Sequence, residues 1–167
     1  YKKHKFMRRG DAEENPMYKQ IIPYLIFETN GKVFLMRRKQ DHTDSRLSSK
    51  YSLGIGGHIN RKDIKEPKSQ RVREDGIMAW ARREFEEEID YRGKYTTEFL
   101  GLLNDDSNEV GLVHLGLVIR LMGETNNIKV RDEHKLGRLV SLEQAGKYYL
   151  RMETWSQIVY DFLMGNK

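Results

Sequence analysis

The sequence predicts an α/β (α+β) fold in which helices pack against a mixed sheet. Two β-prone runs flank Asn30-Gly31, a helical apolar stripe runs from Asp75 to Ile89, and further strand-length runs precede a closing helix. Strands and amphipathic helices bury their apolar faces against one another, which favours a layered sandwich. The 167 residues suit one domain of ordinary size. We expect an irregular basic lead-in over 1–17 and a single domain over 18–167.

The first predicted element is a hairpin. Mostly apolar, β-branched and aromatic residues cover 19–28 and recur over 32–38, on either side of Asn30-Gly31. Two such runs around Asn-Gly are the strongest short-range hairpin signal. Residues 51–59 follow a polar loop and predict a short strand rich in glycine, where glycine usually indicates close backbone approach.

The central predicted helix covers Asp75 to about Ile89. Ile77, Ala81, Phe85 and Ile89 recur every four residues and form one apolar stripe. Asp75 is a plausible N-cap or first-turn acid. A charged loop over 60–74 separates this helix from the glycine-rich strand.

Strands and short helices are predicted for the rest of the chain. Residues 96–103 and 110–121 form strand-like runs around a turn at 105–108, and residues 128–130 are a candidate for a third short strand. Ser141 and Gln144 have the spacing of a capping box for a helix over 142–148. The closing helix is expected over 152–164, with an inner face of Trp155, Ile158, Val159 and Phe162.

Composition excludes several classes of protein. The chain has no cysteine, which rules out disulfides, thiolate zinc sites and cysteine nucleophiles. No apolar run reaches the ~18–20 residues of a membrane helix, and no signal peptide is apparent. We therefore expect a cytoplasmic protein without a membrane partner. The net charge of +5 suits a polyanionic ligand but does not distinguish a phosphate-rich small molecule from nucleic acid.

Three glutamates on the central helix are candidate metal ligands. At about 100° per residue, Glu84, Glu87 and Glu88 fall at roughly 0°, −60° and +40° around the axis, whereas Glu86 points to the other side. Carboxylates crowded at such spacings repel one another, and a bound Mg²⁺ would offset the repulsion. The alternative is a solvated acidic helix face. The border position of Glu84 and Glu88 beside the apolar stripe favours the metal site, because carboxylates there are costlier than in open water.

The glutamate-rich segment resembles the second half of the Nudix box, which ends Arg-Glu-U-x-Glu-Glu-x-Gly-U, with U apolar. The matching residues are Arg83-Glu84-Phe85-Glu86-Glu87-Glu88-Ile89-Asp90-Tyr91. Gly56-Gly57-His58-Ile59 resembles the start of the same box. The order of predicted elements also resembles the family fold over most of residues 18–165.

The chain departs from the Nudix pattern in four places. Gly57 and Asp75 lie eighteen positions apart rather than six, so about twelve extra residues form a long insertion between them. Asp75 replaces a glutamate, Asp90 replaces the glycine that ends the helix, and Ile55 replaces a proline. These changes leave the metal carboxylates intact, but they affect the loop conformation and the substrate that it admits.

The resemblance implies a Mg²⁺-dependent hydrolase that cleaves a diphosphate linkage in a nucleoside diphosphate derivative, with Mn²⁺ as an alternative cofactor. By position, the metal ligands would be Glu84, Glu87, Glu88 and the carbonyl of Gly57. Either Glu84 or Glu87 would serve as the general base. Arg83 would orient a glutamate through a bidentate pair.

Other assignments rest on weaker patterns. Arg37 and Arg38, at the end of the hairpin, could contact substrate phosphates. A further carboxylate could come from a loop, and Glu133 is favoured over the other candidates, Asp105, Asp106, Glu109 and Glu124. His58 stays unassigned, because a lone histidine in a strand is more often packed or hydrogen-bonded than a ligand.

Two alternative functions are less well supported by the sequence than the hydrolase. An isoprenyl diphosphate isomerase of the same fold depends on a cysteine, which this chain lacks. A non-catalytic nucleotide- or RNA-binding module would be favoured by an incomplete acidic triad, but the triad is present; the basic N-terminal arm is the sole support for RNA and lacks interleaved aromatics. The substrate is not identified by the sequence, and a homodimer is compatible with it.

Overall fold

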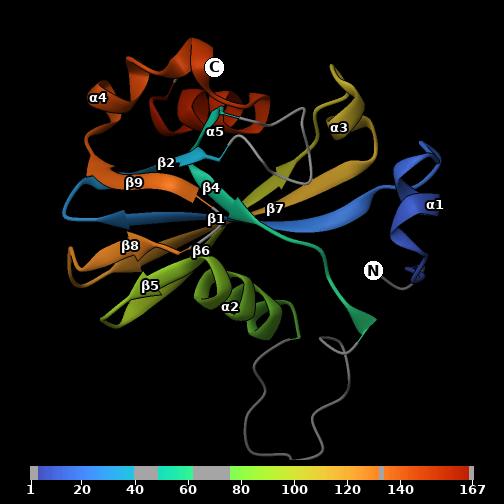
Figure 1. Ribbon diagram of the computed structural model, residues 1–167, viewed down its shortest axis with the longest axis horizontal. Helices are drawn as coiled ribbons and strands as arrows, with labels where there is room; N and C mark the ends of the chain where they lie inside the picture. Colours follow the sequence, from blue (N-terminus) through green and yellow to red (C-terminus); the bar gives the residue numbers. More distant parts are fainter. Residues whose placement is uncertain (1–3, 40–48, 62–75, 132–133, 166–167) are drawn as a thin grey trace, which may run out of the picture.

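A computed structural model describes residues 4–39, 49–61, 76–131 and 134–165 (Figure 1). The strands are β1 (Gln20–Thr29), β2 (Lys32–Arg38), β3 (Tyr51–Ser52), β4 (Gly54–Gly56), β5 (Ile89–Tyr91), β6 (Tyr95–Leu103), β7 (His114–Gly123), β8 (Ile128–Val130) and β9 (His134–Val140). The helices are α1 (Arg9–Glu13), α2 (Gly76–Glu88), α3 (Glu109–Leu112), α4 (Leu142–Gly146), α5 (Thr154–Leu163) and the 3₁₀ turn η3 (Tyr149–Arg151).

The main sheet is mixed, as predicted. Its central path runs β3-β2-β1-β7-β6, with β4 also paired to β1 and β9 paired to β2. β1 pairs with β7 in parallel and with β2 and β4 in antiparallel orientation. Helix α2 covers one face and α4 with α5 covers the other, so the predicted sandwich of helices around a sheet is confirmed (Figure 1).

Side-chain alternation along β1 explains the two-sided core. Leu25 and Phe27 belong to one apolar cluster with Phe85 of α2. Tyr24 and Ile26 point to the opposite face and share a cluster with Val159 of α5. Because successive side chains of a strand point to opposite faces, one continuous apolar strand can be buried between two helical layers.

The hairpin prediction is confirmed at the turn. β1 and β2 pair directly next to the turn, with Thr29 opposite Lys32. Asn30 and Gly31 have φ values of 49° and 69°. Positive φ at both central residues is the requirement of a type I′ turn, which asparagine and glycine meet at low cost.

Three sequence expectations are corrected by the structure. Residues 110–112 are helical rather than extended, since Asn108 accepts hydrogen bonds from the backbone N–H groups of Val110 and Gly111 and so caps α3. Val159 of the closing helix is buried, but Ile158 and Phe162 are 42% and 59% exposed, so they are not part of its inner face. The basic lead-in contains one short helix, α1.

Other expectations have mixed outcomes. The capping box of Ser141 and Gln144 is present at the start of α4. Asp75 and residues 62–75, which hold most of the insertion, lie outside the described residues. Among the described helices, none has both the length and the apolar character that a membrane span requires.

Candidate functional site

Packing of α2 on the sheet determines which of its glutamates are buried. Ala81 and Phe85 join the cluster formed with β1, β2, β4 and β7, which orients the apolar stripe of α2 toward the sheet. Glu84 and Glu88 flank this stripe and are only 8% and 5% exposed. Burying two carboxylates at the edge of an apolar core carries a free-energy cost unless charged or hydrogen-bonding partners compensate it.

Arg83 links two of the candidate ligands. Its guanidinium contacts Glu84 Oε1 at 2.7 Å and donates to Glu87 Oε2 at 2.9 Å. The sequence predicted that Arg83 would orient a glutamate through a bidentate pair; the guanidinium instead bridges two different carboxylates. The planar arrangement of guanidinium donors permits this double contact, which holds Glu84 and Glu87 close together despite their like charge.

The glycine-rich strand brings Gly57 against α2. β4 pairs with β1, and Gly57 follows directly after β4. A Cβ atom placed on Gly57 would lie 1.8 Å from Glu84 Oε2, which no real side chain could tolerate. The Glu84 carboxylate therefore lies directly against the backbone of Gly57, and this close approach requires glycine at this position.

The donor set suits a hard divalent cation. Helical geometry places Glu84, Glu87 and Glu88 on one side of α2, and Gly57 supplies backbone next to Glu84. Mg²⁺ prefers oxygen ligands and is usually bound through carboxylates together with substrate phosphates. Glu86, which helical geometry places on another side of α2, is exposed, and so is Glu87.

The two arginines predicted to contact substrate already have protein partners. Arg38 Nε lies 3.6 Å from Glu153 Oε2, and both side chains are largely buried. Glu153 Oε1 in turn accepts a hydrogen bond from the Tyr24 hydroxyl at 2.8 Å. The Arg37 guanidinium lies over the Tyr51 ring, 5.8 Å from its centroid. Glu133, the further carboxylate proposed from the sequence, lies outside the described residues.

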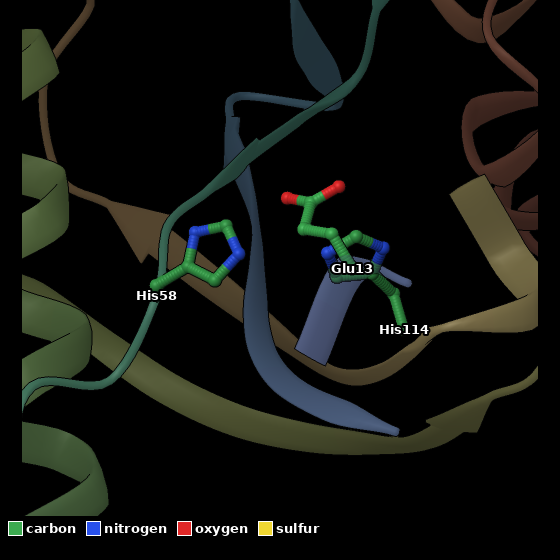
Figure 2. Close-up of side chains that lie close together, drawn as sticks. All are labelled: Glu13, His58 and His114. Carbon is green, nitrogen blue, oxygen red and sulfur yellow. The ribbon is translucent and has the colours of Figure 1, made fainter. Parts of the chain in front are cut away.

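A second group of polar side chains contains none of the predicted site residues. Glu13, His58 and His114 converge from α1, the segment after β4, and the start of β7 (Figure 2). Potential ligand atoms of the three residues lie within 4.8 Å of one another. No sequence signal could reveal the group, because its members are separated by more than forty residues and meet only through tertiary packing.

Comparisons with known proteins identify similar chains over nearly the whole sequence. Protein YmaB of Bacillus subtilis (strain 168) is 37% identical over 170 residues, which cover 94% of this chain and 77% of YmaB. The crystal structure of Tm1382, a candidate Nudix hydrolase, is 31% identical and has a TM-score of 0.75. The match covers 95% of this chain and 78% of the Tm1382 chain. No family model matches the sequence.

A more distant structure supports the same fold. The NUDIX domain of Shewanella oneidensis NrtR, complexed with ADP ribose, is 12% identical with a TM-score of 0.62. The match covers 95% of this chain and 98% of the NrtR chain. The similarity to Tm1382 extends over most of both chains. The order of elements and the glutamate-bearing helix agree with this similarity. The chain belongs to the Nudix hydrolase family.

Proposed function

We propose that the chain is a Mg²⁺-dependent hydrolase that cleaves a diphosphate linkage in a nucleoside diphosphate derivative, with Mn²⁺ as an alternative cofactor. The observation that carries this proposal is the arrangement of Glu84, which rests on Gly57 and is linked through Arg83 to Glu87. Residues 18–167 would act as one catalytic unit. The absence of cysteine suits action in the reducing cytoplasm.

Four groups would hold the cation: the carboxylates of Glu84, Glu87 and Glu88 and the backbone carbonyl of Gly57. A bound divalent cation supplies charge neutralisation at the diphosphate and lowers the pKa of a water ligand. The remaining chemistry belongs to the protein. Arg83 keeps two carboxylates in fixed positions, which reduces the conformational entropy lost when the site is assembled.

One of the Arg83-linked carboxylates would take the proton from the attacking water. Glu84 is buried, whereas the Glu87 side chain is 57% exposed, so the two candidates differ in access to solvent. A positioned carboxylate that accepts a proton typically contributes about 10²–10⁴-fold to a rate. Both remain candidates for this role, and their glutamine variants would separate them.

The choice of test substrates follows from the charge of the site and from the relatives. The NrtR domain binds ADP ribose, and another structural neighbour, from Francisella tularensis, is a bifunctional NMN adenylyltransferase/ADP ribose pyrophosphatase complexed with AMP and Mn. ADP-ribose therefore belongs in the panel. The same phosphoric anhydride linkage occurs in dinucleoside polyphosphates, modified nucleoside triphosphates and capped RNA. These compounds complete the panel of test substrates.

The proposal is tested by incubating the chain with each compound in Mg²⁺ and measuring the nucleotide and phosphate products. We expect cleavage of at least one compound, with loss of activity in chelator. Glu87→Gln should abolish most of this turnover, because it removes a proposed ligand while keeping the size of the side chain. Absence of turnover across the panel would exclude the hydrolase proposal and favour a non-catalytic binding module. Equal turnover by Glu87→Gln would exclude Glu87 as a ligand of the catalytic metal.

A further inference from the structure

The group formed by Glu13, His58 and His114 has the chemistry of a transition-metal site rather than a magnesium site. It combines two imidazoles with one carboxylate, whereas the α2 site offers oxygen atoms alone. Imidazole nitrogen suits Zn²⁺ and related cations, while Mg²⁺ prefers oxygen. The two sites therefore differ in the metal that they would select.

The hydrogen bonds of His114 define which of its nitrogens can bind a metal. Nδ1 lies 2.6 Å from the carbonyl oxygen of Val110, and a carbonyl can only accept, so Nδ1 carries the proton. Nε2 therefore has the lone pair, which accepts from the Gln20 amide at 3.2 Å. A ring N–H bonded to a backbone carbonyl is the arrangement that orients metal-binding histidines. A cation would replace the Gln20 amide at Nε2.

His58 faces this group with its ring. The ring centroids of His58 and His114 lie 5.5 Å apart at an interplanar angle of 70°. Nε2 of His58 is buried and has no hydrogen-bond partner among the described residues. A buried ring nitrogen without a hydrogen-bond partner can offer its lone pair to a cation.

Glu13 completes the group with a negative charge. Its carboxylate pairs with Arg9 at 3.2 Å, and its side chain is 24% exposed, so it can move toward a cation. Zinc bond lengths near 2.1 Å place tetrahedral ligand atoms about 3.4 Å apart. The widest spacing in the group, 4.8 Å, must therefore shorten. Rotation of the Glu13 side chain on the short helix α1 offers the simplest way to achieve this.

We propose that Glu13, His58 and His114 form a second metal site, selective for Zn²⁺ or a similar transition-metal cation, beside the α2 carboxylates. His58 directly follows Gly57, so the two sites are joined through one peptide unit. Three protein ligands leave a fourth position for water or a ligand oxygen, as in open zinc sites. The proposal stands apart from the hydrolase activity, because it concerns metal binding alone.

The test measures Zn²⁺ binding to the metal-free full chain, without an affinity tag that contains histidine, in excess Mg²⁺ to saturate the oxygen site. Calorimetry should give one Zn²⁺ per chain for the wild type. Loss of an outer hydrogen bond typically weakens metal affinity ~10–100-fold, so loss of a ligand in His58→Ala should weaken it about 100-fold or more. Glu13→Gln should also weaken Zn²⁺ binding, because it removes the negative charge of the third ligand at a partly exposed position.

Matched controls separate the site from non-specific binding. His4→Ala removes an exposed histidine and Glu14→Gln removes the exposed carboxylate next to Glu13; both should bind Zn²⁺ like the wild type. Glu87→Gln should also retain this binding, which distinguishes the site from the α2 carboxylates. Circular dichroism verifies that each variant is folded. Absence of Zn²⁺ binding by the wild type, or unchanged affinity in folded His58→Ala and Glu13→Gln, would overturn the proposal.

Discussion

At the scale of single residues, Gly57 is the position where the backbone lies directly against a proposed metal ligand, Glu84. Its missing side chain leaves room for the Glu84 carboxylate, which would lie 1.8 Å from an added Cβ. The glycines of this strand predicted close backbone approach, and the structure identifies the Glu84 carboxylate as the approaching group. A glycine in a strand can therefore predict that another group approaches the backbone closely, but the sequence does not identify that group.

Gly57→Ala should impair hydrolysis without unfolding the chain. The added methyl group forces the Glu84 carboxylate away, and a displacement of about 1 Å at a catalytic centre can cost on the order of 100-fold in rate. Comparison of kcat/KM for the variant and the wild type measures the effect. Gly10→Ala is the control, because nothing lies within 4 Å of a Cβ at Gly10. Full activity in a folded Gly57→Ala variant would contradict this role.

At the scale of elements, the turn before β7 shows where sequence patterns mislead. The apolar run 110–121 suggested one strand, but polar side chains at its start form a local network. Asp105 accepts hydrogen bonds from Ser107 and Asn108, and Asn108 caps α3. Such local side-chain to backbone bonds compete with strand formation, and apolar periodicity does not register them.

The network should make stability depend on pH through Asp105. Burial raises the pKa of this carboxyl, but hydrogen bonds from Ser107, Thr154 and Asn108 outweigh burial and lower it from 3.8. The stabilisation is therefore present above the ordinary pKa and is lost as the pH falls through the lower folded value. Asp105→Asn should reduce the free energy of unfolding by about 1–3 kcal/mol at neutral pH.

Urea unfolding of wild type and Asp105→Asn over a pH series checks this expectation. The difference in unfolding free energy should shrink as the pH is taken below 3.8. Glu124→Gln, which neutralises an exposed carboxylate on another turn, should show little difference at neutral pH. A difference that stays constant over the series would show that Asp105 contributes through packing rather than through its charge.

At the scale of the whole molecule, local patterns predicted the layers but not their long-range contacts. The hairpin, α2 and the mixed sheet between helices follow from turn chemistry and periodicity. The pairing of β5 with β8 and the convergence of Glu13, His58 and His114 depend on segments distant in sequence, which single-chain patterns do not encode. The contacts of Arg37 with Tyr51 and of Arg38 with Glu153 could not be predicted for the same reason, because tertiary packing brings these residues together.

The proposed α2 site was predictable for a physical reason. Its three carboxylates lie on one helix, so helical geometry alone places Glu84, Glu87 and Glu88 on a common side and Glu86 elsewhere. The role of Gly57 was implied by the Nudix resemblance, and its contact with Glu84 required the fold.

The most direct test compares Glu84→Gln with Glu86→Gln on the best substrate of the panel. Both changes remove one carboxylate from α2, but Glu84 rests on Gly57 whereas Glu86 is exposed. We predict that kcat/KM falls about 100-fold or more in Glu84→Gln and stays near the wild-type value in Glu86→Gln. Equal activity of the two folded variants would contradict the proposal that the Glu84–Gly57 arrangement forms the hydrolytic centre.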